Sequence, residues 1–142
     1  MTLHHIKLCV GADSIEDLAD WQKKRAAQRK RNGGSSDIMH ITRMTPKRGD
    51  ELLAGGSLYW VIKGQIAVRQ KLLALKPVVR EGVPHCALVL DMKLVPTVRR
   101  PHRAFQGWRY FDGKDAPRDL KARDKAALPE ALRAELTQLG LL

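Results

Sequence analysis

The chain alternates between apolar and polar positions in several short runs, and each such run predicts a β-strand. Residues 2–10 (TLHHIKLCV) and 37–44 (DIMHITRM) follow this pattern, whereas 57–64 (SLYWVIKG), with its β-branched and aromatic content, and 86–91 (CALVLD) are nearly continuous apolar runs that also predict strands. A period of two is typical of strands with one buried face, and β-branched and aromatic residues favour strands further. The pattern therefore predicts a sheet drawn from the first two thirds of the chain.

A long helix is predicted between the first two strands. Ser14 suits the N-cap position, and Asp17 three residues later imitates a capping box. Acidic residues come early in this segment and basic residues come late, as the helix dipole favours. The loop at 32–36 (NGGSS) should end the helix. Its basic run, residues 23–31, forms either a solvated face or an edge that contacts phosphate.

Two shorter helices are also expected. The segment 45–56 places Thr45 at the cap and Pro46 in the first turn, before a glycine pair that stops the helix. Free amides near Pro46 would then form an anion site beside Lys47 and Arg48. The C-terminal segment, LPEALRAELTQLGLL, is amphipathic, with its leucines on one face.

Residues 65–79 fit either a strand or a helix. We favour a strand, because Gly64 precedes the segment and a hairpin-like pair, residues 76–91, follows it. The segment 92–127 shows no regular pattern. Strands and helices are mixed without regular βαβ alternation, which predicts an α+β fold with a mostly antiparallel, barrel-like sheet and flanking helices. The length predicts a single domain over 1–142.

Charge is the one unusual property of the composition. The chain has 26 Lys and Arg against 15 Asp and Glu, a formal net charge of +11. Such an excess predicts attraction to polyanions, either nucleic acid or anionic lipid. A basic surface with no such partner remains the alternative.

Other features of the sequence predict a cytoplasmic protein. No apolar run is long enough to cross a membrane, and the N-terminus does not have the pattern of a secretory signal. Cys9 and Cys86 both lie in strand-like apolar runs, so we expect buried free thiols in a reducing compartment.

Five histidines raise the question of a metal site, but their spacing in the sequence does not support one. The five histidines form no HxH or HExxH motif, and the two cysteines form no CxxC motif, so no metal or other cofactor is expected. The chain also lacks a GxSxG elbow, a phosphate-binding P-loop and a dinucleotide-binding glycine motif.

One enzymatic hypothesis remains open. His40 could act as a general base, with Arg43 or Lys63 as an electrostatic stabiliser, on a nucleotide or another phosphorylated small molecule. It depends on strands 37–44 and 57–64 lying side by side.

Basic and aromatic residues gather in three segments, 40–48, 59–64 together with Arg69, and 99–110. Arginine and lysine bind phosphates, and aromatic rings stack on bases, so these segments predict contact with RNA or another single strand. The expected phosphate contacts are Lys47, Arg48, Lys63, Arg69, Arg99, Arg100, Arg103 and Arg109, and the expected stacking rings are Tyr59 and Trp108. Scarce aromatic residues often anchor a core instead, which we favour for Trp60.

The blocks HITRMTPKR, LLAGGSLYWVIKG, LVLD and RAFQGWRY, in this order, resemble an uncharacterised alphaproteobacterial family, the domain of unknown function 1489 family. The resemblance runs nearly end to end and implies a bacterial cytoplasmic protein, but it implies no activity. A second, fold-level likeness is to PUA/ASCH-like RNA-binding barrels, which implies a basic cleft for RNA.

Three functions are therefore carried forward. The first is a basic protein that binds RNA or single-stranded nucleic acid. The second is the enzyme built on His40. The third is a scaffold or regulatory protein, with the C-terminal leucine helix as the interface of a homodimer.

Overall fold

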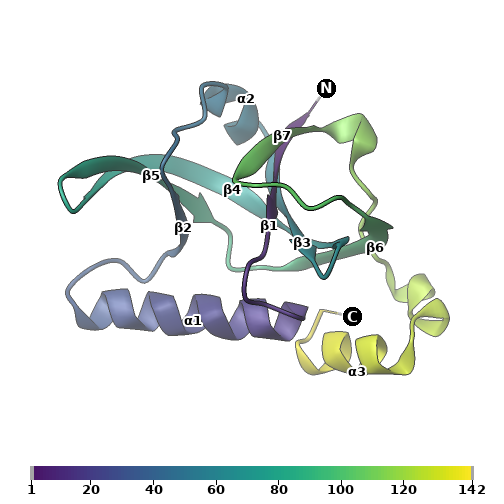
Figure 1. Cartoon of the computed structure of the whole chain (residues 1–142). Helices are drawn as coiled ribbons and strands as arrows, with labels where there is room; N and C mark the ends of the chain where they lie inside the picture. The colour runs from purple at the N-terminus through teal and green to yellow at the C-terminus, as the bar shows by residue number, and fades with distance from the viewer. Residues whose placement is uncertain (1, 142) are drawn as a thin grey trace.

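Seven strands form one mixed sheet, with helices on its flanks (Figure 1). The structure, a computed structural model, describes residues 2–141 except for the side chains of residues 122, 125 and 126. The strands are β1 (Leu3–Leu8), β2 (Ile38–Thr42), β3 (Ser57–Ile62), β4 (Gln65–Arg80), β5 (Val83–Leu90), β6 (Val95–Pro101) and β7 (Trp108–Asp112). The helices are α1 (Ile15–Arg31), α2 (Gly49–Leu53) and α3 (Glu130–Gln138), with short 3-10 helices η1 (Gly113–Asp115) and η2 (Ala122–Ala127).

The strand order is β2-β5-β4-β3-β1-β7, and β6 also pairs with β4. β1 and β3 are parallel, whereas the other five pairings are antiparallel. The predicted α+β class with a mostly antiparallel sheet is therefore confirmed. In the described part of the chain, β2 and β7 form the two ends of the sheet and do not pair, so the sheet is not closed into a barrel.

Two tight hairpins fix the register of the central strands. Lys63 and Gly64 join β3 to β4 with φ values of 49° and 76°, and Glu81 and Gly82 join β4 to β5 with 50° and 77°. Two successive residues with positive φ define a type I′ turn, whose twist matches that of the flanking strands. These turns account for the strand, rather than the helix, at residues 65–79.

The long strand β4 makes the sheet curl. Its first half pairs with β3 and β6, its second half pairs with β5, and the β4–β5 register shifts between Leu72 and Ala74. Such a bulge bends a strand and increases its twist. As a result, the ring of His40 in β2 lies 5.4 Å from the ring of Trp60 in β3, although β4 and β5 separate these strands in the sheet.

Helix α1 forms as its sequence predicts. The Ser14 Oγ accepts a hydrogen bond from the Asp17 N–H at 3.1 Å, and the helix ends at Arg31. Ile15 and Leu18 are fully buried in the main core cluster. The helix therefore covers one side of the sheet below β2, with its basic C-terminal half beneath the β4–β5 hairpin (Figure 1).

A buried glutamine connects this helix to the sheet. The Gln70 Oε1 in β4 accepts hydrogen bonds from the Trp60 Nε1 at 2.9 Å and from the Gln22 Nε2 at 2.7 Å. The Gln70 Nε2 donates to the Gln22 Oε1 and to the Asp91 carbonyl. All four hydrogen-bonding positions of the amide are thereby used. The buried position of Trp60, favoured from its sequence, is confirmed.

The short helix begins later than predicted. α2 starts at Gly49 with Arg48 as its N-cap, whereas Thr45 and Pro46 lie in the extended chain before it. At the observed start, the Arg48 N–H donates to the Tyr110 hydroxyl at 3.1 Å. The predicted helix start at Pro46 is therefore wrong, whereas phosphate binding at Lys47 and Arg48 stays a prediction.

The sequence did not predict β6 and β7. Prolines and arginines interrupt the apolar pattern of β6, and β7 has only five residues. β6 pairs with β4, and β7 pairs with β1. Both strands therefore form through contacts with segments distant in sequence, which the local pattern of apolar residues does not reveal.

The leucine face of α3 is used within the chain. Leu136 is fully buried, and Leu132 and Leu139 pack against the main core cluster. A homodimer stays a prediction, but this face is already covered by the protein's own core.

Replacing Gln70 by leucine should destabilise the fold by about 2–4 kcal/mol, because the Trp60 indole N–H, the Gln22 amide and the Asp91 carbonyl would lose buried partners. Urea unfolding measures this change. Gln65→Leu, on an exposed position of the same strand, is the control and should change stability little. A Gln70→Leu loss below about 1 kcal/mol would contradict the structural role of this amide.

Candidate functional site: a basic groove around β2

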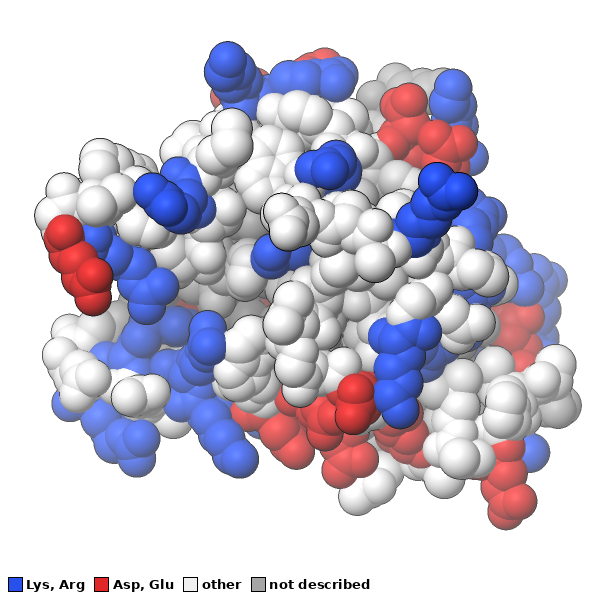
Figure 2. All heavy atoms as spheres, viewed as in Figure 1, with Lys and Arg blue, Asp and Glu red and all other residues white. Residues whose placement is uncertain are grey.

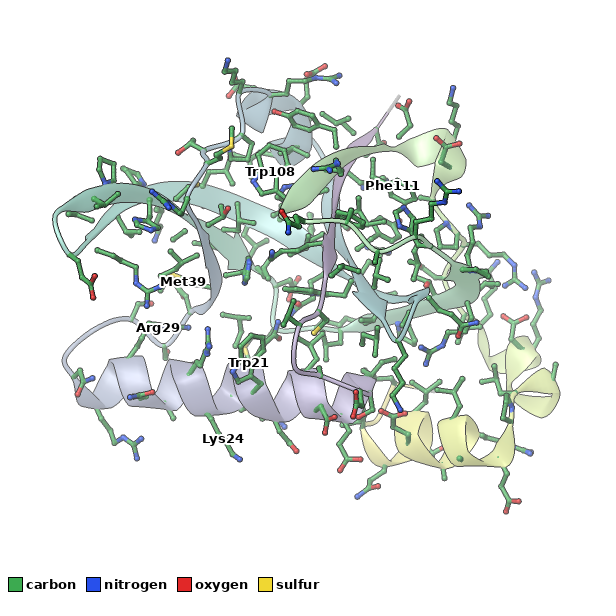
Figure 3. All side chains as sticks on the ribbon, in the orientation of Figure 1. Trp21, Lys24, Arg29, Met39, Trp108 and Phe111 are labelled. Carbon is green, nitrogen blue, oxygen red and sulfur yellow. The ribbon has the colours of Figure 1, made fainter. Side chains whose placement is uncertain are left out.

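A pocket opens between β2 and the loop that leads into β7. It has a volume of about 590 Å³. β2 contributes His40 and the residues after it, and the β7 side contributes Gln106 to Arg109. Lys7 of β1 also lines it. We call it the Trp108 pocket, after the half-buried indole in its wall (Figure 3).

Two more hollows adjoin the Trp108 pocket on either side of β2. One lies between β2 and the C-terminal half of α1, where Arg29 rises from the helix toward Met39 (Figure 3). The other lies at the β4–β5 hairpin beside His85. Ile41, Arg43 and Arg80 each line two of the three hollows, so the hollows are neighbours that share walls. We call the three together the β2 groove.

Positive charge dominates the β2 groove. Its lining cations are Lys7, Arg25, Arg29, Arg43, Arg80 and Arg109. Among the described lining residues the one acidic side chain is Glu81, in the hairpin turn. Figure 2 shows Lys and Arg gathered at the lower left of this face and again along its right side, whereas Asp and Glu gather below the middle, over the start of α1. The groove therefore carries one of the basic areas of this face.

The deep wall of the Trp108 pocket is built by strand register. Lys7 in β1 is paired with Trp60 in β3 and with Trp108 in β7, so the three side chains share one face of the sheet. His5, two residues before Lys7, lies on the same face. The His5 ring meets Trp108 edge-on, with ring centroids 4.4 Å apart, and His40 meets Trp60 in the same way across the curl of the sheet.

His5 is buried without a hydrogen-bond partner. It is 0% exposed, and neither its Nδ1 nor its Nε2 forms a hydrogen bond within the described chain. The adjacent His4, on the opposite face of β1, accepts a hydrogen bond at its Nδ1 from the Ser57 N–H at 3.0 Å. Buried polar groups are normally paired, so His5 is an exception that calls for an explanation.

Burial and positive neighbours keep the two histidines of this cluster uncharged. Burial, together with the nearby His40 and Lys7, lowers the pKa of His5 to about 3. Burial also lowers the pKa of His40 to about 4, again with help from Lys7 and from Arg25. The pKa of Lys7 is lowered by burial as well. Both imidazoles are therefore neutral near pH 7 and can donate and accept hydrogen bonds.

The structure brings together four of the residues predicted as site residues. His40, Arg43, Trp108 and Arg109 all line the Trp108 pocket. Strands 37–44 and 57–64 are not neighbours, contrary to the condition set for the enzyme hypothesis, and Lys63 lies exposed in the β3–β4 turn. His40 and Arg43 nevertheless share a pocket, so the enzyme hypothesis stays a prediction built on those residues.

Two other predicted residues have structural partners. Arg69 binds Asp119 through two hydrogen bonds, of 2.7 and 2.8 Å, and donates a third to the Ser57 Oγ. Its guanidinium is therefore committed within the fold. Tyr59 is 4% exposed and packs against His4 and Phe111, so its ring is not available to stack on a base.

The remaining predicted contacts lie outside the residues that line the β2 groove. Arg99 and Arg100 are on β6, and Arg103 is exposed in the loop after it. Arg48 pairs with Glu51 and lies over the Tyr110 ring. The other two, Lys47 and Lys63, are exposed in turns on either side of β3.

Sequence reasoning missed three residues. Lys7 and Arg80 line the β2 groove, and the buried His5 lies against Trp108. The alternation in HHIKL places His5 and Lys7 on the same face of a strand, which was a usable signal. Arg80 carried no signal, because its place depends on the length and curl of β4. Arg25 and Arg29 belong to the basic run 23–31, whose helical face toward β2 follows only from the packing of α1.

Comparison with known proteins places the chain in a family without assigning it an activity. Residues 5–142 match the family described as protein of unknown function (DUF1489), and the chain belongs to this family. No curated protein and no solved structure matches the chain, so the likeness to RNA-binding barrels stays a prediction. Within the described residues, no helix combines the length and apolar character needed to span a bilayer. The same residues contain no group of three or more His, Cys, Asp or Glu side chains that could hold a metal ion.

Acidification should destabilise the protein between about pH 6.5 and pH 4. The unfolded chain binds protons at the ordinary histidine pKa near 6.5, whereas folded His5 and His40 stay neutral to about 3 and about 4. The stability present at pH 7 is therefore lost as the pH falls through this window, on the order of 2 kcal/mol per histidine.

Urea unfolding at pH 7.5 and pH 4.5, with NMR titration of the histidine ring protons, measures both quantities. His5→Leu should remove part of the pH dependence. Resonances of His5 and His40 that titrate near pH 6.5 in the folded protein would contradict their buried, uncharged state.

Proposed function

We propose that the protein binds single-stranded nucleic acid, with RNA as the first candidate, along the β2 groove. The observation that carries this proposal is a set of three neighbouring hollows that share lining residues and are lined by six cations and one acidic residue. A polyanion that enters such a groove gains from phosphate contacts and from the release of its counterions.

The aromatic content of the groove supports a single strand over a duplex. Trp108 is half-buried in the pocket wall, beside Arg109 and across from Arg43. An indole face next to arginines suits an unstacked base with its phosphates, and such stacking is worth about 1–3 kcal/mol per base.

The acidic surface limits where a strand can run. Glu16, Asp17 and Asp20 occupy the first half of α1, away from the groove (Figure 2). Their repulsion of phosphates would direct a bound strand toward the C-terminal half of the helix, where Arg25 and Arg29 line the groove. The proposed path therefore runs from the Trp108 pocket along β2 to the end of α1.

Charge reversal separates this groove from the general basicity of the chain. Arg43→Glu and Arg80→Glu should each weaken binding of a short oligoribonucleotide about tenfold at roughly 0.1 M salt, and should reduce the salt dependence of the affinity. Both side chains are exposed, so the fold should tolerate the changes. Fluorescence polarisation across a salt series measures the effect.

Arg100→Glu is the matched control. It makes the same change in net charge at an exposed residue outside the groove, and should alter affinity by less than about threefold. Equal losses from all three substitutions would mean that only the net charge attracts nucleic acid. No measurable binding by the wild-type protein at low salt would remove the proposal.

A further inference from the structure

We propose that the Trp108 pocket is a discrete site for one nucleotide unit, with Lys7 and Arg43 on its phosphate and the neutral imidazoles of His5 and His40 on its base. This proposal rests on the proposed function and deepens it, because it places one nucleotide of a bound strand in one particular pocket. The same chemistry is present in a free nucleoside monophosphate and in one unit of a strand, and the test below distinguishes these two sources.

The first argument is the unpaired state of His5. A buried polar group without a partner costs about 1–3 kcal/mol. His5 carries two such nitrogens, at 0% exposure, behind the indole that lines the pocket. An apolar residue at this position would avoid the cost entirely. A ligand that reaches past the indole edge and hydrogen bonds to His5 explains why the fold carries an imidazole there.

The second argument is the unpaired charge of Lys7. It is half-buried in the pocket wall, and within the described residues it forms no ion pair with an acidic side chain. Arg43 and Arg109 line the same pocket, and none of its described lining residues is acidic. A half-buried cation without a counter-charge favours an anionic ligand, so the site suits a phosphate.

The third argument is the size and shape of the site. A volume of about 590 Å³ is within the range of pockets that hold small molecules, and it can accept a base, a sugar and a phosphate. The indole of Trp108 offers a flat surface for a heterocycle, and Gly107 beside it, with φ of 70°, adopts a backbone conformation that glycine tolerates at no steric cost. Entry of a base would turn the indole away from His5.

Isothermal titration calorimetry with adenosine and uridine 5′-monophosphates, inorganic phosphate and octamers of the same bases tests the proposal. The variants are Lys7→Met, which keeps the apolar stem, and His5→Leu, which removes the unpaired nitrogens. Arg80→Met, in the groove but outside the Trp108 pocket, is the matched control.

The wild-type protein should bind a monophosphate more tightly than inorganic phosphate. Lys7→Met should weaken monophosphate binding about tenfold or more, whereas Arg80→Met should leave it unchanged and weaken only the octamer. His5→Leu should also weaken monophosphate binding while it maintains or raises the melting temperature, because a buried unpaired polar group is removed. A His5 with only a structural role would give the reverse pattern.

Unchanged monophosphate affinity in Lys7→Met overturns this proposal, and this variant decides the matter if His5→Leu fails to fold. Octamer binding without monophosphate binding at millimolar concentration, and with no effect of Lys7→Met, overturns it while the proposed function survives. Monophosphate binding with no gain for the octamer supports the pocket as a site for free nucleotides and removes the proposed function. Failure to bind any of these ligands removes both.

Discussion

The architecture depends on the buried amide of Gln70, which connects three parts of the molecule at one point. It binds the Trp60 indole in β3, the Gln22 side chain in α1 and the carbonyl of Asp91 after β5. A fully satisfied polar network in a core fixes a unique arrangement, because any displacement leaves a polar group unpaired. Trp60, held by this network, meets His40 of β2 at 5.4 Å, so the amide also fixes the distance across the curled sheet.

The same sheet face carries polar groups of two kinds. Around Gln70 every donor and acceptor has a partner within the chain, and this region holds α1 on the sheet. A few residues away, His5 has no partner and Lys7 has no counter-charge, although the neighbouring His4 is paired. Buried polar groups are thus paired around Gln70 and unpaired beside the Trp108 pocket. The simplest explanation of this difference is a ligand that binds in the pocket.

Local patterns predicted much of the fold but little of the site. The cap at Ser14, the strands β1 to β3 and the strand at residues 65–79 follow from the properties of short segments, and the structure confirms them. β6 and β7 depend on pairing with distant strands, and α2 begins after Pro46, next to Arg48, whose N–H binds the Tyr110 hydroxyl of β7.

The candidate site is harder to predict because it is formed by curvature. His40, Arg43, Trp108 and Arg109 were recognisable as residue types, but Arg80 and Lys7 join them only because β4 bends and β1 lies beside β7. Arg69 was equally basic in sequence, yet Asp119 engages it inside the fold. The count of positive charges indicated a partner class, whereas the position of each charge required the three-dimensional structure.

The most direct test of a ligand surface around β2 is a titration of the ¹⁵N-labelled protein with a single-stranded oligoribonucleotide, followed by amide and indole chemical shifts. The largest changes should fall on residues 38–43 and 106–109, on the indole N–H of Trp108 and on the C-terminal half of α1. Changes confined to β6, η1 and the first turns of α1, with the Trp108 indole unmoved, would contradict a binding groove around β2.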